Sequence, residues 1–316
     1  MSTQEGSPTP IPPPPHPTYD LDKVIRGALE EDSGGLGDVT SLATIPEGTQ
    51  AEAWFLAKAD GVLAGVGVAI RVFEIVDANL LVKWVAKDGD RVQPGMKIGQ
   101  VTGSAQSILV AERIALNFMQ RMSGIATATH QMVEKTKGTS AKILETRKTT
   151  PGLRMLDKWA VLIGGGQNHR MGLYDMMMIK DNHIAAAGGI RSAVERAHSF
   201  IAERQLEDMH IEVETRTMAE VTEIIEILEG WGEGCRVSRV MLDNMAKRVE
   251  NGVDVSMLKA AVDLVGKRVE TEASGNVTIE TIKEIASTGV DYVSCGALTH
   301  SVIALDISLK IETKPQ

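Results

Sequence analysis

The sequence predicts an α/β protein whose C-terminal half is a parallel-stranded barrel of the (β/α)₈ type, complete or incomplete. After about residue 140, short apolar runs alternate with helix-length stretches, which is the pattern of parallel βαβ units. Polar residues gather at the C-terminal end of each apolar run, where barrel enzymes have their active sites. A doubly wound open sheet is the alternative, although no G-x-G-x-x-G motif follows an early strand.

Composition limits the class of protein. The 316 residues suit two domains, or one large barrel with additions. A net charge of −9 does not provide the positive field that general nucleic-acid binding needs, and no apolar run is long enough to span a membrane. Only Cys235 and Cys295 are present, too few for a disulfide framework or a zinc cage, which indicates a reducing compartment.

The N-terminal half begins with a tail that we expect to be disordered over residues 1–18. Seven of the eleven prolines lie in the first 20 residues. No Lys or Arg precedes Lys23, so the tail resembles neither a signal peptide nor a transit peptide. We therefore expect a cytoplasmic protein, whereas an incomplete or processed N-terminus would allow a mitochondrial or plastid location.

Periodicity then predicts the elements in chain order. Residues 19–31 have helical spacing, and a long helical pattern runs from Ala111 to Met122. Strand-like segments lie between them, with glycine turns over residues 87–103. The predicted strands of both halves are 51–59, 62–64, 80–85, 142–145, 176–179, 210–213, 239–242, 268–272 and 290–294. The helices predicted in the second half are 190–201, 218–228, 255–265 and 279–286.

The charges at the strand ends are sorted by sign. Residues 142–180 contain seven basic and three acidic residues, although the whole chain is acidic. Later strands end in Glu214, Asp243 and Glu272. Arginine binds carboxylate and phosphate through paired donors, and carboxylates serve Mg²⁺. A pocket with one basic and one acidic side therefore favours an anionic substrate together with a divalent metal.

A second candidate is the run of three glycines followed by His169 and Arg170. The glycines allow close approach of the backbone to a ligand; for a lone glycine run a flexible loop is the favoured explanation, and the neighbouring Arg147 and Lys148 add weight to a site. The chain has no G-x-S-x-G, P-loop or C-x-x-C motif. Cys295 follows an apolar strand, which favours a small core residue over a nucleophile.

Seven ordered motifs resemble the signatures of the quinolinate phosphoribosyltransferase family, also called nicotinate-nucleotide pyrophosphorylase (carboxylating). They occupy residues 145–154, 164–170, 178–184, 212–214, 241–244, 272–276 and 296–301. The similarity extends upstream to residues 111–113 and Asn117 and covers roughly residues 19–311. Residues 16–21 resemble the plant-type branch.

The resemblance implies an N-terminal α/β sandwich domain over residues 19–130, to which residues 303–316 return. It implies an incomplete α/β barrel, similar to a TIM barrel, as the catalytic domain over residues 131–302. It also implies a homo-oligomer, a dimer or a hexamer, in which the N-terminal domain of one subunit completes the active site of another.

The implied reaction joins quinolinate to phosphoribosyl pyrophosphate, with Mg²⁺, giving nicotinate mononucleotide, pyrophosphate and CO₂ for NAD biosynthesis. Arg113 of a neighbouring subunit would reach a substrate carboxylate. The implied catalytic residues are Lys148, Glu214 and Asp243, of which Glu214 and Asp243 would serve the ribose hydroxyls and the metal, directly or indirectly. The implied substrate-binding residues are Arg113, Thr146, Arg147, Lys148, His169, Arg170, Lys180, Glu214, Asp243, Ser274, Gly275, Asn276, Ser294, Cys295, Gly296 and His300.

Within this set, Arg147, His169 and Arg170 would hold the two carboxylates of quinolinate, and Lys148 and Lys180 would lie near a carboxylate and the phosphates. Backbone N–H groups would bind the 5′-phosphate. The residues that would provide them are Ser274, Gly275, Asn276, Ser294, Cys295 and Gly296.

Three other interpretations stay open. A phosphoribosyltransferase for nicotinate would need one carboxylate clamp, whereas the surplus of cations favours a dicarboxylate. A related barrel protein linked to molybdenum uptake is a second alternative. Residues 88–103 resemble a biotinyl or lipoyl carrier, but residues 104–112 offer no lysine that could be modified.

Overall fold

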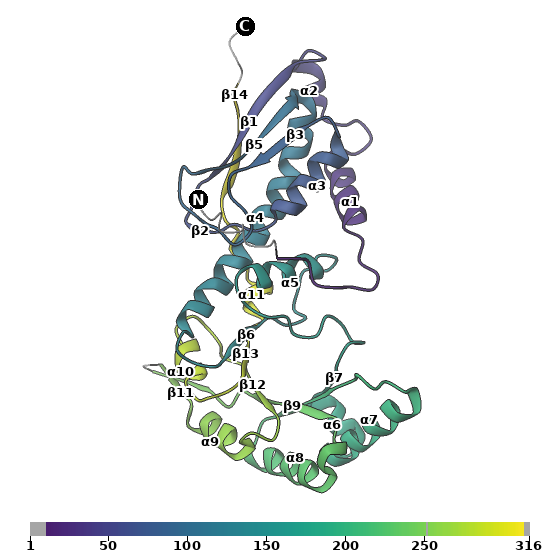
Figure 1. Ribbon diagram of the computed structural model, residues 1–316, viewed down its shortest axis with the longest axis vertical. Helices are drawn as coiled ribbons and strands as arrows, with labels where there is room; N and C mark the ends of the chain where they lie inside the picture. The colour runs from purple at the N-terminus through teal and green to yellow at the C-terminus, as the bar shows by residue number, and fades with distance from the viewer. Residues whose placement is uncertain (1–10, 251, 313–316) are drawn as a thin grey trace, which may run out of the picture. The chain divides into compact units, whose positions relative to one another are not determined.

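Residues 11–250 and 252–312 are described in a computed structural model of the chain. The chain divides into two compact units (Figure 1). The first unit comprises residues 1–130, 149–165 and 298–316, and the second comprises residues 131–148 and 166–297. Our expectation placed residues 149–165 in the barrel domain, whereas their contacts group them with the first unit.

The first unit contains a four-stranded antiparallel sheet in the order β14-β1-β5-β3. Alternate residues of β1 are buried, so one face of this strand packs into the core. Strand β14 pairs with β1, which places the first and last strands of the unit side by side in one sheet. The strands of the unit are β1 (Gln50–Ala57), β2 (Gly61–Val62), β3 (Leu81–Trp84), β4 (Arg91–Val92), β5 (Lys97–Ser104) and β14 (Ile307–Glu312).

Helices pack against this sheet around an aliphatic core that includes Phe55 and Phe73, whose rings meet edge to face. The first helix begins after Asp20, whose side chain accepts a hydrogen bond from the backbone N–H of Lys23. The helices are α1 (Leu21–Ser33), α2 (Val39–Thr44), α3 (Val66–Val76), α4 (Ala105–Lys135), α5 (Arg154–Ile163) and α11 (Ala297–His300). Of these helices, the sequence did not predict α2, α3, α5 or α11.

The expected disordered tail needs a correction at one residue. Residues 1–10 lie outside the described part of the chain. Ile11 packs against the core of the first unit, and its carbonyl accepts a hydrogen bond from the indole N–H of Trp159, with 2.9 Å between N and O. The tail is therefore held at Ile11 by α5.

The second unit is built on a six-stranded parallel sheet in the order β6-β13-β12-β9-β8-β7. The first strand along the chain, β6, pairs with the last, β13, and every other pair joins strands that are consecutive within this sheet. This is the order of a barrel that is open between β6 and β7, which confirms the incomplete barrel and makes the doubly wound alternative wrong. The strands are β6 (Lys142–Leu144), β7 (Met177–Ile179), β8 (Ile211–Thr215), β9 (Val237–Asp243), β12 (Glu270–Ser274) and β13 (Tyr292–Ser294).

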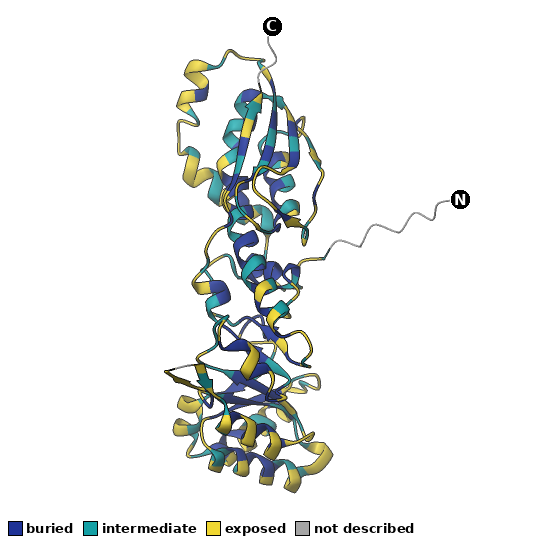
Figure 2. Cartoon of the chain, turned by 90° about the vertical axis from the view of Figure 1, so that its left-hand side faces the viewer, coloured by how far each residue is buried: buried dark blue, intermediate teal, exposed yellow. Residues whose placement is uncertain are grey.

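Helices cover the outer side of this sheet, with exposed residues on their outward faces and buried residues toward the strands (Figures 1 and 2). The sheet's two open edges are β6 and β7, and between them the chain passes through α5 of the first unit. The helices and the additional hairpin are α6 (Asp181–Ala187), α7 (Ile190–Arg204), α8 (Met218–Trp231), η1 (Gly232–Gly234), β10 (Lys247–Val249), β11 (Gly252–Asp254), α9 (Ser256–Val265) and α10 (Ile282–Ala286).

Candidate active site

A pocket of about 430 Å³ lies at the C-terminal ends of the parallel strands in the second unit. Each of the six strands contributes a lining residue or is followed by one. Because parallel strands end at the same edge, residues that are far apart in the sequence meet there. The lining residues are Thr146, Arg147, Lys148, His169, Arg170, Met178, Lys180, Glu214, Arg216, Met241, Asp243, Glu272, Ser274 and Ser294.

The acidic side of the pocket is formed by Glu214 and Asp243 at the ends of β8 and β9. Lys180 Nζ lies 2.8 Å from Glu214 Oε2. Arg216 bridges the two carboxylates, because its Nη2 lies 3.1 Å from Glu214 Oε1 and its Nε lies 3.2 Å from Asp243 Oδ2. Its Nη1 also contacts Asp181 at 2.7 Å. The two acids are thus arranged to share one cation.

The basic side is formed by Arg147, Lys148 and Arg170. The Nε atom of Arg147 is buried and has no hydrogen-bond partner among the described residues. Burial lowers the pKa of Arg170, and the nearby positive charge of Arg147 lowers it further. Two guanidinium groups that repel each other and leave a buried donor unused are suited to an anionic ligand.

A cluster of buried charges lies beneath the pocket. His169 Nε2 is 3.1 Å from Glu212 Oε2 and 3.2 Å from Glu272 Oε2, and both carboxylates have no solvent exposure. Burial alone would lower the pKa of His169, but the two carboxylates outweigh it and raise the pKa to about 9. The imidazole is therefore held as a cation between two acids.

Glu145 fixes the segment that carries His169. This carboxylate is fully buried after β6, where its Oε1 accepts a hydrogen bond from the backbone N–H of His169 at 3.0 Å. Its Oε2 accepts a hydrogen bond from the amide of Asn168 at 2.9 Å. The loop that follows the three glycines is consequently attached to the strand beside it.

The turn after β12 lies beside the end of β9. Gly275 has a φ of +88°, and a Cβ at this position would collide with the side-chain amide of Asn244. Asn244 and Asn276 also have positive φ values, of 55° and 57°. The amide of Asn276 donates a hydrogen bond to the carbonyl of Ala246 at 3.0 Å, which joins the two turns. Glycine is needed here because the backbone of one turn approaches the other.

The structure brings most of the expected site residues into this one pocket. Gly275, Asn276, Cys295 and Gly296 directly follow the lining residues Ser274 and Ser294. Arg113 and His300 belong to the first unit, so their expected roles stay predictions.

Sequence reasoning gave no role to three lining residues, Met178, Arg216 and Met241, and it counted Glu272 among the acidic strand ends without giving it a ligand. Alternation along a strand was the available signal, because residues two apart point to the same side of a sheet. That rule places Glu272 on the side of Ser274, and Met241 on the side of Asp243.

Two groups of side chains could hold a metal. His169, Glu212 and Glu272 are metal-binding residue types whose ligand atoms lie within 4.8 Å of one another. Arg239 already contacts Glu272, with 3.2 Å between Nη1 and Oε2, so positive charge is supplied there by protein groups. Glu214 and Asp243 face the pocket and share the guanidinium of Arg216, so they fit a hydrated Mg²⁺ that arrives with a phosphorylated ligand.

The fold and the pocket define a barrel enzyme that binds anionic substrates at the C-terminal ends of its strands. Residues 125–310 match the family described as quinolinate phosphoribosyl transferase, C-terminal domain, and residues 38–123 match its N-terminal domain. The chain belongs to the quinolinate phosphoribosyltransferase family, and it is a phosphoribosyltransferase.

Individual proteins agree with this assignment. A chloroplastic nicotinate-nucleotide pyrophosphorylase (carboxylating) from Arabidopsis thaliana is 60% identical over 305 residues, which are 96% of this chain and 86% of that protein. The mitochondrial quinolinate phosphoribosyltransferase (decarboxylating) 2a of Nicotiana tabacum is 56% identical over the same shares. The crystal structure of NadC from Streptococcus pyogenes is 37% identical and superimposes with a TM-score of 0.83, covering 93% of this chain and 98% of that one.

Proposed function

We propose that this chain transfers the phosphoribosyl group of phosphoribosyl pyrophosphate to the ring nitrogen of quinolinate. The bond between ribose C1 and the pyrophosphate oxygen breaks, and the bond between C1 and the pyridine nitrogen forms. The ring then loses the carboxylate next to that nitrogen as CO₂, and a proton takes its place. The products are nicotinate mononucleotide, pyrophosphate and CO₂, as the pyridine branch of NAD biosynthesis requires.

The basic side of the pocket is the observation that carries the choice of substrate. Arg147 and Arg170 are close enough for the charge of one to lower the pKa of the other, and the Nε atom of Arg147 has no partner among the described residues. A dicarboxylate neutralises both guanidinium groups through paired hydrogen bonds, whereas a monocarboxylate leaves one of them unpaired. We therefore favour quinolinate over nicotinate.

The acidic side of the pocket suits the transfer step. Departure of pyrophosphate builds positive charge on the ribose ring. Glu214 and Asp243 line the pocket, and in this proposal their carboxylates stabilise that charge and bind ribose hydroxyls. Mg²⁺, when bound with the pyrophosphate, neutralises the leaving group. Lys148 and Lys180 are placed to bind phosphate or carboxylate oxygens. The pyridine nitrogen is itself the nucleophile, so the pocket needs no serine or cysteine nucleophile.

The loss of CO₂ depends on orientation. The positive charge on the ring nitrogen after transfer stabilises the carbanion that forms beside it. The protein holds the ring by its carboxylates and keeps water from the departing group. Thr146 and the backbone of the turns after β12 and β13 complete the binding surface, the turns for the 5′-phosphate.

The test is a reaction with phosphoribosyl pyrophosphate and Mg²⁺, with quinolinate and nicotinate run in parallel. We expect stoichiometric CO₂ and nicotinate mononucleotide from quinolinate and no product from nicotinate. Product from nicotinate alone would leave the phosphoribosyl site intact but would remove the roles proposed for Arg147 and Arg170. Omission of Mg²⁺ by chelation is expected to abolish product formation.

The cellular compartment is a further part of the proposal. No helix in the described part of the chain has the length and apolar character needed to cross a membrane. The Arabidopsis relative is named chloroplastic and the Nicotiana relative mitochondrial. We propose an organellar location for this chain in place of the cytoplasm, tested by imaging the full chain fused at its C-terminus to a fluorescent protein.

A further inference from the structure

A row of ionic contacts crosses the interior of the second unit, from the N-terminal ends of the strands to the pocket. Arg239 Nη1 lies 3.2 Å from Glu272 Oε2, and the same oxygen lies 3.2 Å from His169 Nε2. His169 Nε2 is also 3.1 Å from Glu212 Oε2. These four side chains form what we call the interior ionic row: Arg239, Glu272, His169 and Glu212.

Strand register brings the row together. In the sheet, Glu212 of β8 is paired with Arg239 of β9, which is paired with Glu270 of β12. Paired residues point to the same side of a sheet, and Glu272 lies two residues beyond Glu270 on that same side. The row is thus a consequence of how the three strands align.

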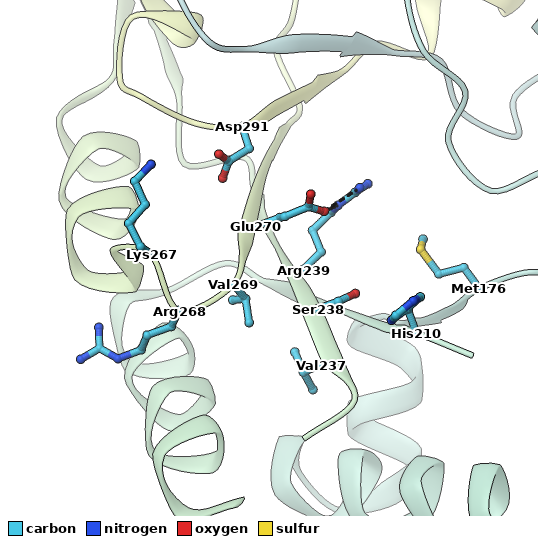
Figure 3. A pocket seen from close by; sticks show the side chains of 10 residues that line it. All are labelled: Met176, His210, Val237, Ser238, Arg239, Lys267, Arg268, Val269, Glu270 and Asp291. Atoms are coloured by element: carbon cyan, nitrogen blue, oxygen red, sulfur yellow. Dashed lines mark hydrogen bonds and ion pairs between the residues drawn. The ribbon is translucent and has the colours of Figure 1, made fainter. Parts of the chain in front are cut away.

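Arg239 enters the row from the end of the barrel opposite the substrate pocket. It lines a second cavity, of about 670 Å³, at the N-terminal ends of the strands, where it pairs with Glu270 at 3.0 Å (Figure 3). Its guanidinium also lies 3.9 Å from the ring centre of Tyr292. Arg239 is therefore held from three sides and lies outside the substrate pocket.

The charges explain why the row needs Arg239. Glu212 and Glu272 are both fully buried and repel each other. Burial would raise the pKa of Glu272, but His169 and Arg239 hold it below its usual value, whereas burial and Glu272 raise the pKa of Glu212. Without Arg239, one imidazole would face two buried acids alone.

We propose that Arg239 is a positioning residue for substrate binding: it fixes Glu272, against which His169 rests at the wall of the substrate pocket. This inference rests on the proposed function. His169 is followed directly by Arg170 in the chain, and both residues line the substrate pocket. A shift of His169 therefore displaces Arg170, which belongs to the carboxylate-binding side, and leaves the ribose and phosphate side in place.

The test compares R239Q with wild type in steady-state kinetics. We expect the KM for quinolinate to rise about tenfold, while kcat and the KM for phosphoribosyl pyrophosphate change less than about twofold. Arg239→Lys keeps one charge contact, so we expect the quinolinate KM to return to within about threefold of wild type. Arg268→Gln is the matched control, because Arg268 lines the same second cavity but pairs with Glu229. Its quinolinate KM should equal that of wild type.

A double variant, R239Q with Glu272→Gln, separates positioning from stability. It removes the unpaired buried acid, so its melting temperature should recover relative to R239Q. The positioning role predicts that its quinolinate KM stays raised, since His169 has lost its charged support. If the KM recovers together with the melting temperature, or if both substrate KM values rise equally in R239Q, the inference is wrong.

If R239Q does not fold, the double variant is compared with the wild type instead. A raised quinolinate KM in the double variant then supports the inference, and a wild-type KM contradicts it. A wild-type enzyme that does not use quinolinate would instead contradict the proposed function, before any variant is compared.

Discussion

The Nε atom of Arg147 is buried beside another guanidinium, so substitution of this residue separates binding from folding. We expect Arg147→Ala to lower kcat/KM for quinolinate by at least about 100-fold, because charge-assisted paired hydrogen bonds are lost. We expect the melting temperature of the ligand-free protein to stay equal or to rise, since repulsion of Arg170 is relieved. Arg147→Lys, which keeps the charge without the paired donors, should recover only part of the activity.

Both quantities are needed to judge Arg147. Activity assays with quinolinate and thermal unfolding without ligand supply them. Wild-type activity in Arg147→Ala would exclude this residue from substrate binding. A large fall in melting temperature would mean that the guanidinium supports the fold instead.

His169 gives the protein a pH-dependent stability. Its pKa is about 9 in the folded chain, because two carboxylates outweigh burial, against about 6.5 when unfolded. Below the unfolded value both states carry the proton, and the ionic contacts contribute fully. As the pH rises toward 9 the unfolded state releases its proton first, so this contribution falls and is lost above 9, by up to about 3 kcal/mol.

The variant His169→Asn, whose side chain does not titrate, is compared with the wild type. Equilibrium unfolding in urea at pH values of about 6, 8 and 10 should show stability falling more steeply in the wild type than in the variant. Parallel pH curves for the two proteins would mean that His169 does not titrate in this window.

At the scale of elements, the turn after β12 depends on Gly275. Alanine here adds backbone strain and places a Cβ against the amide of Asn244, which donates a hydrogen bond to Asp243 at 2.8 Å. We expect Gly275→Ala to raise the KM for phosphoribosyl pyrophosphate about tenfold and to lower the melting temperature. Gly188→Ala is the control, because Gly188 also has a positive φ but has no atom within 4 Å of its Cβ position. It should lower only the melting temperature.

In the first unit, helices α4 and α5 are joined by a buried ion pair. Asp157 is fully buried and accepts hydrogen bonds from Nε and Nη2 of Arg121, both at 2.8 Å. Arg121→Met removes the charged partner of that buried carboxylate and leaves it the hydrogen bond from the backbone N–H of Thr150 at 3.1 Å, so we expect the free energy of unfolding to fall by about 3 kcal/mol. Lys259→Met breaks the exposed pair with Asp263 and should cost less than about 1 kcal/mol. Denaturant titration of both variants measures the difference.

The elements that the sequence predicted are those with a clear pattern. The six strands of the second unit follow from short apolar runs, each ending in polar residues. Helix α3 was missed although its buried residues Val68, Ala69, Val72 and Phe73 have helical spacing, because a short apolar run such as VGVAIRVFEIV is equally typical of a buried strand. Helix α5 was not predicted, and its residues were assigned to the barrel domain, because the local sequence does not say that its apolar face packs into the core of the first unit.

The site residues that lie in sequence motifs were predictable, whereas those that only the strand register brings together were not. Arg147, Lys148 and Arg170 lie in recognisable motifs. Arg239 lies near the start of an apolar strand, and the pairing of β8, β9 and β12 brings it to the buried acids. The spacing of residues in the sequence does not predict the register of these three strands.

At the scale of the whole molecule, the barrel is open between β6 and β7, and the chain enters the first unit in the segment that joins these same two strands. The segment between β6 and β7 carries both α5 of the first unit and the loop with His169 and Arg170 of the second. His169 and Arg170, for which we propose carboxylate binding, therefore lie on the stretch of chain that returns from the first unit to the second.

That assignment gives a prediction about Arg113, which the family resemblance places in the site of a neighbouring subunit. Arg113→Ala and Lys148→Ala should each be inactive alone. Mixed by co-unfolding and refolding, they should regain about a quarter of wild-type activity, because random pairing makes half of the dimers mixed and each mixed dimer has one intact site. If Arg113 serves its own subunit, every site in the mixture lacks one residue, and no activity returns.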